Sequence, residues 1–466
     1  PSGSPAGPGK EQGGGGEVQH TKILHSPILP CWPELGEFLR RRHDAWVLEL
    51  PLPDRTRRVN PGWGMALDVF DTAPRKDSSL VTLVPGMRKR LALFFVCASF
   101  GFPGLNCTGA PVATTSPEID AELGESVWPG EVAATRSIAE LIGRAIEKKY
   151  PPEKRPARRD AHPKAHGCVR ARFAVEPSLP ENLAQGAFVQ GKTYDAWIRF
   201  SNGNSDPERA DIKGDARGMA IKLIGVPGVK LLPEESEAQT QDFIMINHPV
   251  FFIDDPQDYL KLIERGESSN PLVKVTAPLA LGVKGALIAR AISKKQIQNP
   301  LSTRFWSMVP YRLGGDANKQ AIKFSARPCT APTNDRIPEN PDTNYLRKAM
   351  ADTLAAGDAC FDFLVQARTS ASMKVEDSKT EWKEFEAPFI KVATITIPAQ
   401  TFDSPEQMEF CENLSFTPWH SLPEHRPLGG VNRVRRTVYE QVSKVRHALN
   451  RAPREEPTGF IGGGGL

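Results

Sequence analysis

The sequence has little cysteine and no two cysteines separated by only two residues. Its seven cysteines are scattered over 466 residues, which argues against a CxxC zinc site and against a dense disulfide framework. A formal net charge of only +4 is too weak to suggest a nucleic-acid partner. Internal repeats and a phosphate-binding glycine loop are also missing. With 39% hydrophobic and 24% charged residues, the composition is that of a globular protein of one large domain or two.

The N-terminal part has the pattern of a leader followed by a targeting segment. Residues 1–86 open with a run of glycine, proline and serine and show little periodicity, so we expect them to be disordered or to be translated upstream sequence. Met87, three basic residues, the apolar run 91–102 and small residues up to Ala110 predict a signal peptide over 87–110. The apolar run is too short for a stable membrane span. The mature chain is therefore expected to be periplasmic or secreted, with lipidation at Cys107 left open.

The remaining chain divides into an arm, one domain and a tail. Apolar residues spaced three and four apart after Ile138 predict a helix that ends at Pro151, within an N-terminal arm over 111–158. The main domain is expected over 159–450 and a disordered tail over 451–466. Within the domain, six segments rich in β-branched and aromatic residues read as strands: 169–175, 194–200, 218–224, 242–247, 360–367 and 389–397. The fold class is therefore α+β, an antiparallel β-barrel with flanking helices. The apolar stretch 271–293 is expected to pack on it as a helix or helix pair.

The segment 431–450 has the strongest helical pattern. Valines and a leucine at spacings of three and four form an apolar stripe, while Arg435, Tyr439 and Arg446 share another narrow face. An arginine one turn before a tyrosine stabilises the tyrosine anion, and a tyrosinate is one of the few protein ligands for haem iron. A solvated basic face with a half-buried tyrosine is the alternative for this helix taken alone.

Four further motifs precede this helix in a fixed order. They are Arg159-x-x-His162-x-Lys164, Arg199-Phe200-Ser201, Asp215-x-Arg-Gly-Met-Ala-Ile-Lys222 and Asn247-x-Pro-Val-Phe-Phe-Ile-x-Asp-Pro256. Together with Arg435, Tyr439 and Arg446, this order over about 290 residues resembles the haem catalase superfamily. The length of the expected mature chain is similar to that of the small catalase-related peroxidases.

The resemblance implies a haem b cofactor and a role for each motif residue. Tyr439 would bind the iron as tyrosinate, stabilised by Arg435. His162 would move a proton between the two peroxide oxygens, and Asn247 would orient the peroxide. The other cofactor-binding residues implied are Ser201, which would fix the tautomer of His162; Arg159, Arg199 and Arg446, which would pair with the haem propionates; and Phe252, which would pack near the haem.

The implied activity is decomposition of hydrogen peroxide or organic hydroperoxides, a defence against oxidative stress. Ala161 stands before the histidine where the family commonly has valine, so a bulkier peroxide could enter. Two alternatives stay open: a fatty-acid hydroperoxide isomerase or lyase of the allene oxide synthase kind, and a haem-binding protein without turnover. The expected partner is a small peroxide, with no nucleic acid, no stable membrane span and possible homo-oligomers. The electron donor stays open.

Overall fold

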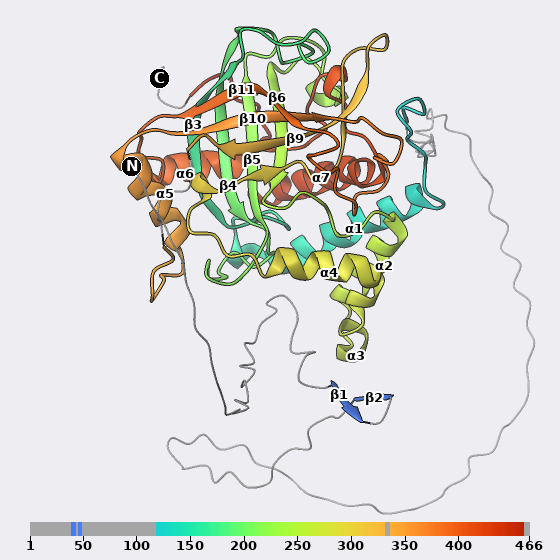
Figure 1. The fold of residues 1–466 in the computed structure, drawn as a ribbon. Coiled ribbons are helices and arrows are strands. Elements are labelled where there is room, and N and C mark those ends of the chain that lie inside the picture. The colour runs from blue at the N-terminus through green and yellow to red at the C-terminus, as the bar shows by residue number, and fades with distance from the viewer. Residues whose placement is uncertain (1–38, 43–44, 49–117, 331–335, 461–466) are drawn as a thin grey trace, which may run out of the picture. The chain divides into compact units, whose positions relative to one another are not determined.

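The computed structural model describes residues 39–42, 45–48, 118–330 and 336–460 (Figure 1). Strands β1 (Leu39–Arg42) and β2 (Ala45–Leu48) pair antiparallel within a unit of their own. The other described ranges belong to a second unit, the domain described below. The predicted signal peptide over 87–110 and most of the predicted leader lie outside the described residues.

An antiparallel β-barrel forms the centre of the domain (Figure 1), as the sequence predicted. Its sheet has nine strands in the order β10-β11-β3-β4-β5-β6-β7-β9-β8, and pairing between β10 and β9 closes the ring while β8 extends from β9. The strands are β3 (Ala165–Val175), β4 (Thr193–Asn202), β5 (Arg217–Ile224), β6 (Thr240–Ile246), β7 (Phe305–Trp306), β8 (Tyr311–Leu313), β9 (Gln320–Pro328), β10 (Ala359–Ala367) and β11 (Phe389–Ile397).

Alternation along the strands fills the barrel with apolar side chains. In β3, Val169, Ala171 and Phe173 are fully buried, while Arg170 and Arg172 between them are more exposed. This is the period of two that a pleated strand imposes. Phenylalanines from several strands meet inside, and the ring centroids of Phe173 and Phe363 are 5.1 Å apart. The barrel interior is therefore a packed core, and the functional cavity must lie outside its centre.

Helices cover the outside of the barrel. The segments predicted to be helical before Pro151 and over 431–450 are α1 (Glu131–Lys149) and α7 (Gly430–Asn450), and their apolar stripes pack together with α2 (Pro256–Glu267). The remaining helices are α3 (Pro271–Lys274), α4 (Gly282–Ser293), α5 (Tyr345–Ala356) and α6 (Pro405–Asn413), and the 3₁₀ turns are η1 (Pro152–Lys154), η2 (Pro233–Glu235), η3 (Ala277–Leu281), η4 (Pro300–Ser302) and η5 (Pro423–His425).

The apolar stretch Pro271–Ser293 is broken into three pieces. By length and composition it is the one helical stretch among the described residues that could cross a membrane. It forms α3, η3 and α4 in succession, with Gly282 at φ 60° between the last two. A span needs about 20 continuous helical residues, whereas α4 has only 12. As folded here, the stretch lies outside the barrel as short helices.

Two features were not predicted from the sequence: a disulfide bond and the packing of the residues that follow α7. Cys329 and Cys360 form a disulfide between the end of β9 and the start of β10. Residues 451–460, which the sequence predicted as the start of a disordered tail, form no helix or strand but contact the barrel. Trp197 donates its indole N–H to the carbonyl of Gly459 at 3.3 Å, and Lys222 pairs with Glu456 at 2.6 Å. The chain therefore continues to pack after α7.

Candidate functional site

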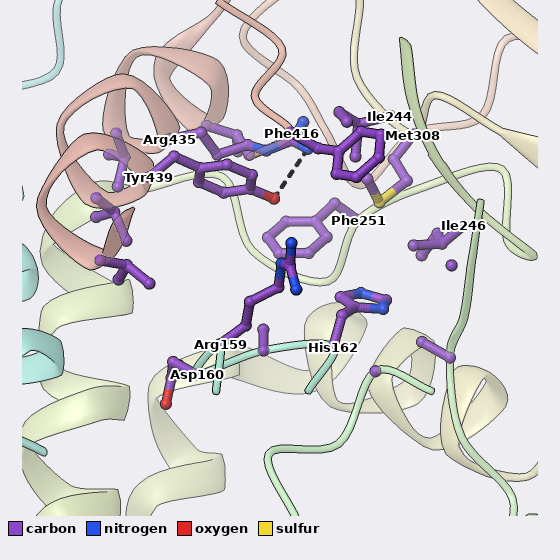
Figure 2. Close-up of a pocket in the computed structure, with 18 of the residues that line it drawn as sticks. Arg159, Asp160, His162, Ile244, Ile246, Phe251, Met308, Phe416, Arg435 and Tyr439 are labelled. Carbon is purple, nitrogen blue, oxygen red and sulfur yellow. Dashed lines mark hydrogen bonds between the residues drawn. The ribbon is translucent and has the colours of Figure 1, made fainter. Parts of the chain in front are cut away.

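A cavity of ≈ 480 Å³ lies between one side of the barrel and helices α1, α2, α4 and α7. Its volume is within the range of small-molecule and cofactor sites, about 300–1,000 Å³. Side chains from segments far apart in the sequence converge on it (Figure 2). Eight of the nine predicted site residues line it: Arg159, His162, Arg199, Ser201, Phe252, Arg435, Tyr439 and Arg446.

Helix α7 presents Tyr439 and Arg435 to one wall of the cavity (Figure 2). The Arg435 guanidinium donates to the Tyr439 hydroxyl at 3.2 Å and to the Oδ1 of Asn432 at 3.1 Å. Although burial opposes it, the nearby hydroxyls of Tyr439 and Tyr311 raise the pKa of Arg435 above its ordinary value. Arg435 is therefore a fixed cation, and it faces a tyrosine oxygen whose anion it would stabilise.

His162 lies on another wall, in the segment that leads into β3 (Figure 2). Its backbone φ is 61°, a conformation that residues other than glycine seldom adopt. Hydrogen bonds hold this conformation: His162 N–H donates to the carbonyl of Gly203 at 3.3 Å, and Arg199 donates to the His162 carbonyl at 2.8 Å. The turn therefore fixes the direction of the imidazole.

The His162 imidazole is neutral. Burial, followed by the charges of Arg199 and Arg435, lowers the pKa of His162 to about 3. Its Nδ1 lies 3.0 Å from the Oγ of Ser201, as expected for a hydroxyl that fixes the tautomer. When Nδ1 carries the proton, Nε2 is a free base. The ring can then accept a proton at Nε2 without first losing one.

Gly218 makes room for this pair. A Cβ at position 218 would lie 2.6 Å from Nδ1 of His162 and 2.8 Å from Oγ of Ser201. Any larger residue would therefore displace the imidazole or the hydroxyl. The motif 215–222 contains this glycine, but the sequence alone does not indicate its role. The role becomes clear only from its contacts with His162 and Ser201 in the folded chain.

Three arginines, two of them buried and one partly buried, lie at the edge of the cavity, and two of the three pair with the same carboxylate. We call Arg159, Arg199 and Arg446 the arginine cluster; Glu412 of α6 lies 2.8 Å from Arg159 and 3.8 Å from Arg199. Burial, followed by the charge of Arg159, lowers the pKa of Arg446 to about 9. Nε of Arg199 has no hydrogen-bond partner within the described part of the chain. Two excess positive charges in a buried site suit an anionic group with two carboxylates.

Asn247 is the one predicted site residue that does not line the cavity, although its neighbour Ile246 does. Its Oδ1 accepts the backbone N–H of Arg217 at 2.8 Å. Its Nδ2 is buried and has no partner among the described side chains and backbone. Both N–H donors of this amide nitrogen are therefore available to a ligand near β6.

Sequence analysis missed two residues of the site. Phe251 lies in the cavity between Arg159 and Tyr439 (Figure 2), and its ring centroid is 4.4 Å from that of Phe252. The motif 247–256 contains both phenylalanines, so that motif was the available signal. Glu412 had no signal, because its importance arises only when α6 packs beside the arginine cluster.

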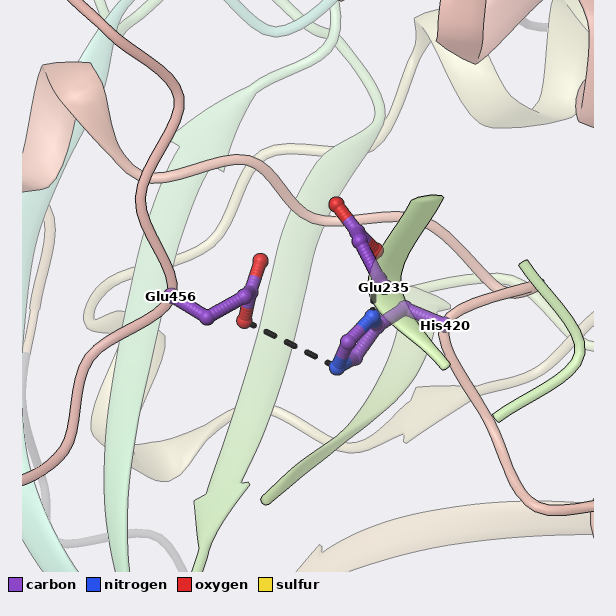
Figure 3. Close-up of side chains that lie close together, drawn as sticks. All are labelled: Glu235, His420 and Glu456. Atoms are coloured by element: carbon purple, nitrogen blue, oxygen red, sulfur yellow. Dashed lines mark hydrogen bonds and ion pairs between the residues drawn. The ribbon is translucent and has the colours of Figure 1, made fainter. Parts of the chain in front are cut away.

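A second polar cluster, Glu235, His420 and Glu456, lies beside Lys222 of β5 near the C-terminal segment, and its histidine is fully buried (Figure 3). Its ligand-type atoms lie within 4.8 Å of one another, a spacing that a metal ion could use. However, Lys222 lies 2.6 Å from Glu456, and Arg454 forms an ion pair with Glu235. Because both carboxylates already have cationic partners, the cluster is better explained as the attachment of residues 454–456 to the barrel.

Comparison with known proteins agrees with this architecture. Residues 146–276 match the family model described as Catalase. A relative from Mycolicibacterium paratuberculosis (strain ATCC BAA-968 / K-10), named Catalase-related peroxidase, is 25% identical over 293 residues, 59% of this chain and 85% of that protein. A solved fungal catalase superposes with a TM-score of 0.52 at 17% identity, over 73% of this chain and 68% of that one. Residues 146–276 therefore match a catalase family model, and the barrel with its flanking helices has the fold of a solved catalase.

Proposed function

We propose that the cavity binds haem b through Tyr439 and that the protein decomposes peroxides. The observation that carries the proposal is the arrangement of three chemically different features around one cavity. A tyrosine hydrogen-bonded to a partly buried arginine faces the cavity from α7, a neutral histidine faces it from the segment before β3, and the arginine cluster lies at its edge. The match to a catalase family model and the relative named Catalase-related peroxidase support the same reading.

The residues present fit haem b. The arginine cluster has more positive charge than Glu412 neutralises, so two haem propionates would compensate it. Tyr439 would bind the iron through its oxygen, since Arg435 stabilises the anionic form. Phe252 and the other apolar residues of the lining, among them Met219, Ile244 and Met308, would pack against the porphyrin. Haem bound in this way supplies the redox centre at which the peroxide bond is cleaved.

His162 would transfer the proton during the reaction. Its neutral imidazole would take the proton from one peroxide oxygen at Nε2 and return it to the other, so that the leaving group departs as water or an alcohol. Ser201 would keep the other nitrogen protonated. Asn247 would orient the peroxide through its unpartnered Nδ2, after a small change that brings the amide to the cavity wall.

Organic hydroperoxides are included in the proposed substrate class. Ala161 lines the cavity beside His162, and a methyl group at this position leaves more space than the valine common in the family. The largely apolar lining would also accept a hydrocarbon substituent. Export to the periplasm or outside the cell, and assembly into homo-oligomers, remain proposals that rest on the sequence.

The test uses the full chain titrated with haem b. A tyrosinate-type absorption spectrum is the expected result, together with oxygen release from hydrogen peroxide or consumption of cumene hydroperoxide when a phenol is added as the electron donor. A His162→Ala variant should retain the spectrum and lose peroxide consumption by about 10²–10⁴-fold. Haem binding without consumption of either peroxide by the unmodified protein would refute the enzymatic proposal and leave a haem-binding protein. Conversion of fatty-acid hydroperoxides to rearranged products would instead identify an isomerase.

A further inference from the structure

The outer face of the segment Pro271–Ser293 is apolar and exposed. Twelve large hydrophobic residues are exposed in the described part of the chain, and six of them lie within 16 residues of sequence here. We call these six the apolar ridge: Leu272 (74% exposed), Val273, Val275, Leu279 (73%), Val283 (81%) and Leu287 (62%). Soluble proteins rarely expose apolar side chains in such a group unless the surface meets a partner.

The charges on the ridge segment itself are of one sign. From Ser268 to Gly315 the chain contains no aspartate or glutamate. The same stretch has exposed basic residues, and Lys274, Arg290 and Lys294 form no ion pair with any described residue. Lys284 donates to the Thr380 hydroxyl and lies near Asp377, and the neighbouring α2 carries acidic as well as basic side chains. The ridge segment therefore combines apolar side chains with basic ones, and the acidic side chains lie on neighbouring elements.

The shape of the segment suits a surface rather than a span. Helix α4 runs beneath the barrel and α3 lies at the lower edge of the domain (Figure 1). The break at Gly282 and the four-residue length of α3 leave no continuous helix long enough to cross a bilayer. Short helices with an apolar face and basic neighbours lie in the membrane interface, with the apolar side chains below the headgroups.

We propose that the apolar ridge is a docking surface for an anionic phospholipid bilayer. The apolar side chains would enter the interface, and Lys274, Arg290 and Lys294 would attract the lipid phosphates. A second copy of this chain is the less favourable occupant. A two-fold interface centred on the ridge would bring together two copies of a segment that has basic and no acidic residues, and like charges repel across such an interface.

Docking would bring one wall of the cavity to the membrane. The inner face of the same segment lines the cavity through Leu281, Ala289 and Ile292. Lipids and their oxidation products would then be supplied next to that wall. The docking itself depends only on the outer face, so it stands whether or not the cavity holds haem.

The experiment is co-sedimentation of the full chain with vesicles, either phosphatidylcholine alone or an equal mixture with phosphatidylglycerol. The expected result is binding to the mixed vesicles, weakened by salt. Leu279→Ser combined with Val283→Ser should weaken the partition coefficient about tenfold or more, since one buried leucine is worth about that factor. Lys274→Glu combined with Arg290→Glu should weaken it by a similar factor.

The matched controls are Val229→Ser, an exposed valine outside the ridge, and Lys154→Glu, an exposed lysine on η1; both should bind like the unmodified protein. All variants retain the apolar run 91–102, so binding through that run would leave ridge and control variants equal and overturn the proposal. Equal binding to phosphatidylcholine alone would also overturn it, as would binding to neither vesicle. Sedimentation as a dimer that the ridge variants dissociate, without vesicle binding, would assign the ridge to a second copy.

Discussion

Arg435 and Tyr439 lie one helical turn apart on α7, and the guanidinium donates to the tyrosine hydroxyl over 3.2 Å. Both belong to the same rigid element, so their geometry is set by the helix and needs no rearrangement when a ligand binds. Arg435 also lies close to the ring of Tyr439, with its guanidinium carbon 5.1 Å from the centroid. If Tyr439 binds iron as proposed, the pair would be a preorganised oxygen ligand with its own counter-ion.

Removing the tyrosine oxygen should abolish the proposed metal ligand. The Tyr439→Phe variant should fold, since the ring is kept, and should lose the tyrosinate absorption of the haem-loaded protein. An Arg435→Leu variant should bind haem less tightly than the unmodified protein, because the proposed tyrosinate ligand loses its neighbouring positive charge. Absorption spectra recorded during haem titration check both results. A spectrum unchanged in Tyr439→Phe would remove Tyr439 as the ligand.

The reaction of peroxide with the enzyme should be insensitive to pH over a wide range. His162 must be neutral to accept a proton, and its pKa of about 3 keeps it neutral down to mildly acidic pH. The rate should therefore stay level from pH 8 to about pH 5, whereas an exposed histidine would lose half its activity near pH 6.5. Rapid mixing of haem-loaded protein with peroxide measures the rate. A midpoint near 6.5 would show that His162 is not the base.

Loss of one arginine from the arginine cluster should weaken haem binding without weakening the empty protein. Arg446→Leu removes a buried cation that Arg159 and Arg199 repel, and it also removes hydrogen bonds to the carbonyls of Glu412 and Leu414. These effects oppose one another, so the free energy of unfolding without haem should stay nearly level. The haem affinity should fall roughly 10- to 100-fold, the value of one charge-assisted hydrogen bond. Haem titration and urea unfolding provide the two measurements. Arg446→Lys keeps the charge and should bind haem more tightly than Arg446→Leu; equal affinities would contradict the charge argument.

Local patterns predicted the strands and helices well, because the two-residue period of a strand and the 3.6-residue period of a helix can be recognised in neighbouring residues. The predicted segments 389–397 and 431–450 match β11 and α7 to within one residue. Strand β9, which closes the barrel against β10, was not predicted, and neither was the disulfide between Cys329 and Cys360. Both depend on which segments meet in space, and local periodicity does not encode that.

The site shows the same difference between features that local sequence predicts and features that depend on which segments meet in space. Eight site residues could be predicted because they belong to ordered motifs, and the cavity brings those eight together. Glu412, which neutralises part of the arginine cluster, is more than 250 residues from Arg159 in sequence. The packing of residues 454–456 depends on pairing between Lys222 and Glu456, 234 residues apart. Neither contact can be recognised from the residues that neighbour it in the sequence.

Substrate size should depend on Ala161. The Ala161→Val variant adds two methyl groups beside His162 in the lining of the cavity. Consumption of cumene hydroperoxide should fall roughly tenfold relative to hydrogen peroxide, because a bulky substituent meets the added volume and the smaller peroxide does not. The ratio of the two rates is the measurement, with Ala161→Gly as a control that should not lower it. A ratio unaffected by valine would place the entry of the peroxide elsewhere.

Folding stability should fall in mild acid, and His425 offers a single-residue test. The backbone N–H of Ala187 donates to Nε2 of His425 at 2.9 Å, so this nitrogen must be unprotonated in the folded protein. A Cβ at Gly186 would lie 2.5 Å from the same atom, which shows how closely the ring is enclosed. Burial lowers the pKa of His425 to about 3, whereas in the unfolded chain it returns to its ordinary value of about 6.5.

Between these two pKa values the unfolded chain binds one more proton than the folded protein, so the free energy of unfolding falls as the pH falls. The contribution of His425 is about 1.4 kcal/mol for each pH unit below 6.5. His166 acts in the same direction, and Asp242, whose pKa burial raises to about 6, acts in the opposite one. His425→Gln keeps an acceptor for Ala187 and cannot be protonated. Urea unfolding at pH 7.5 and pH 5.5 should therefore show a smaller loss of stability in this variant than in the unmodified protein, and an equal loss would mean that His425 becomes protonated without unfolding.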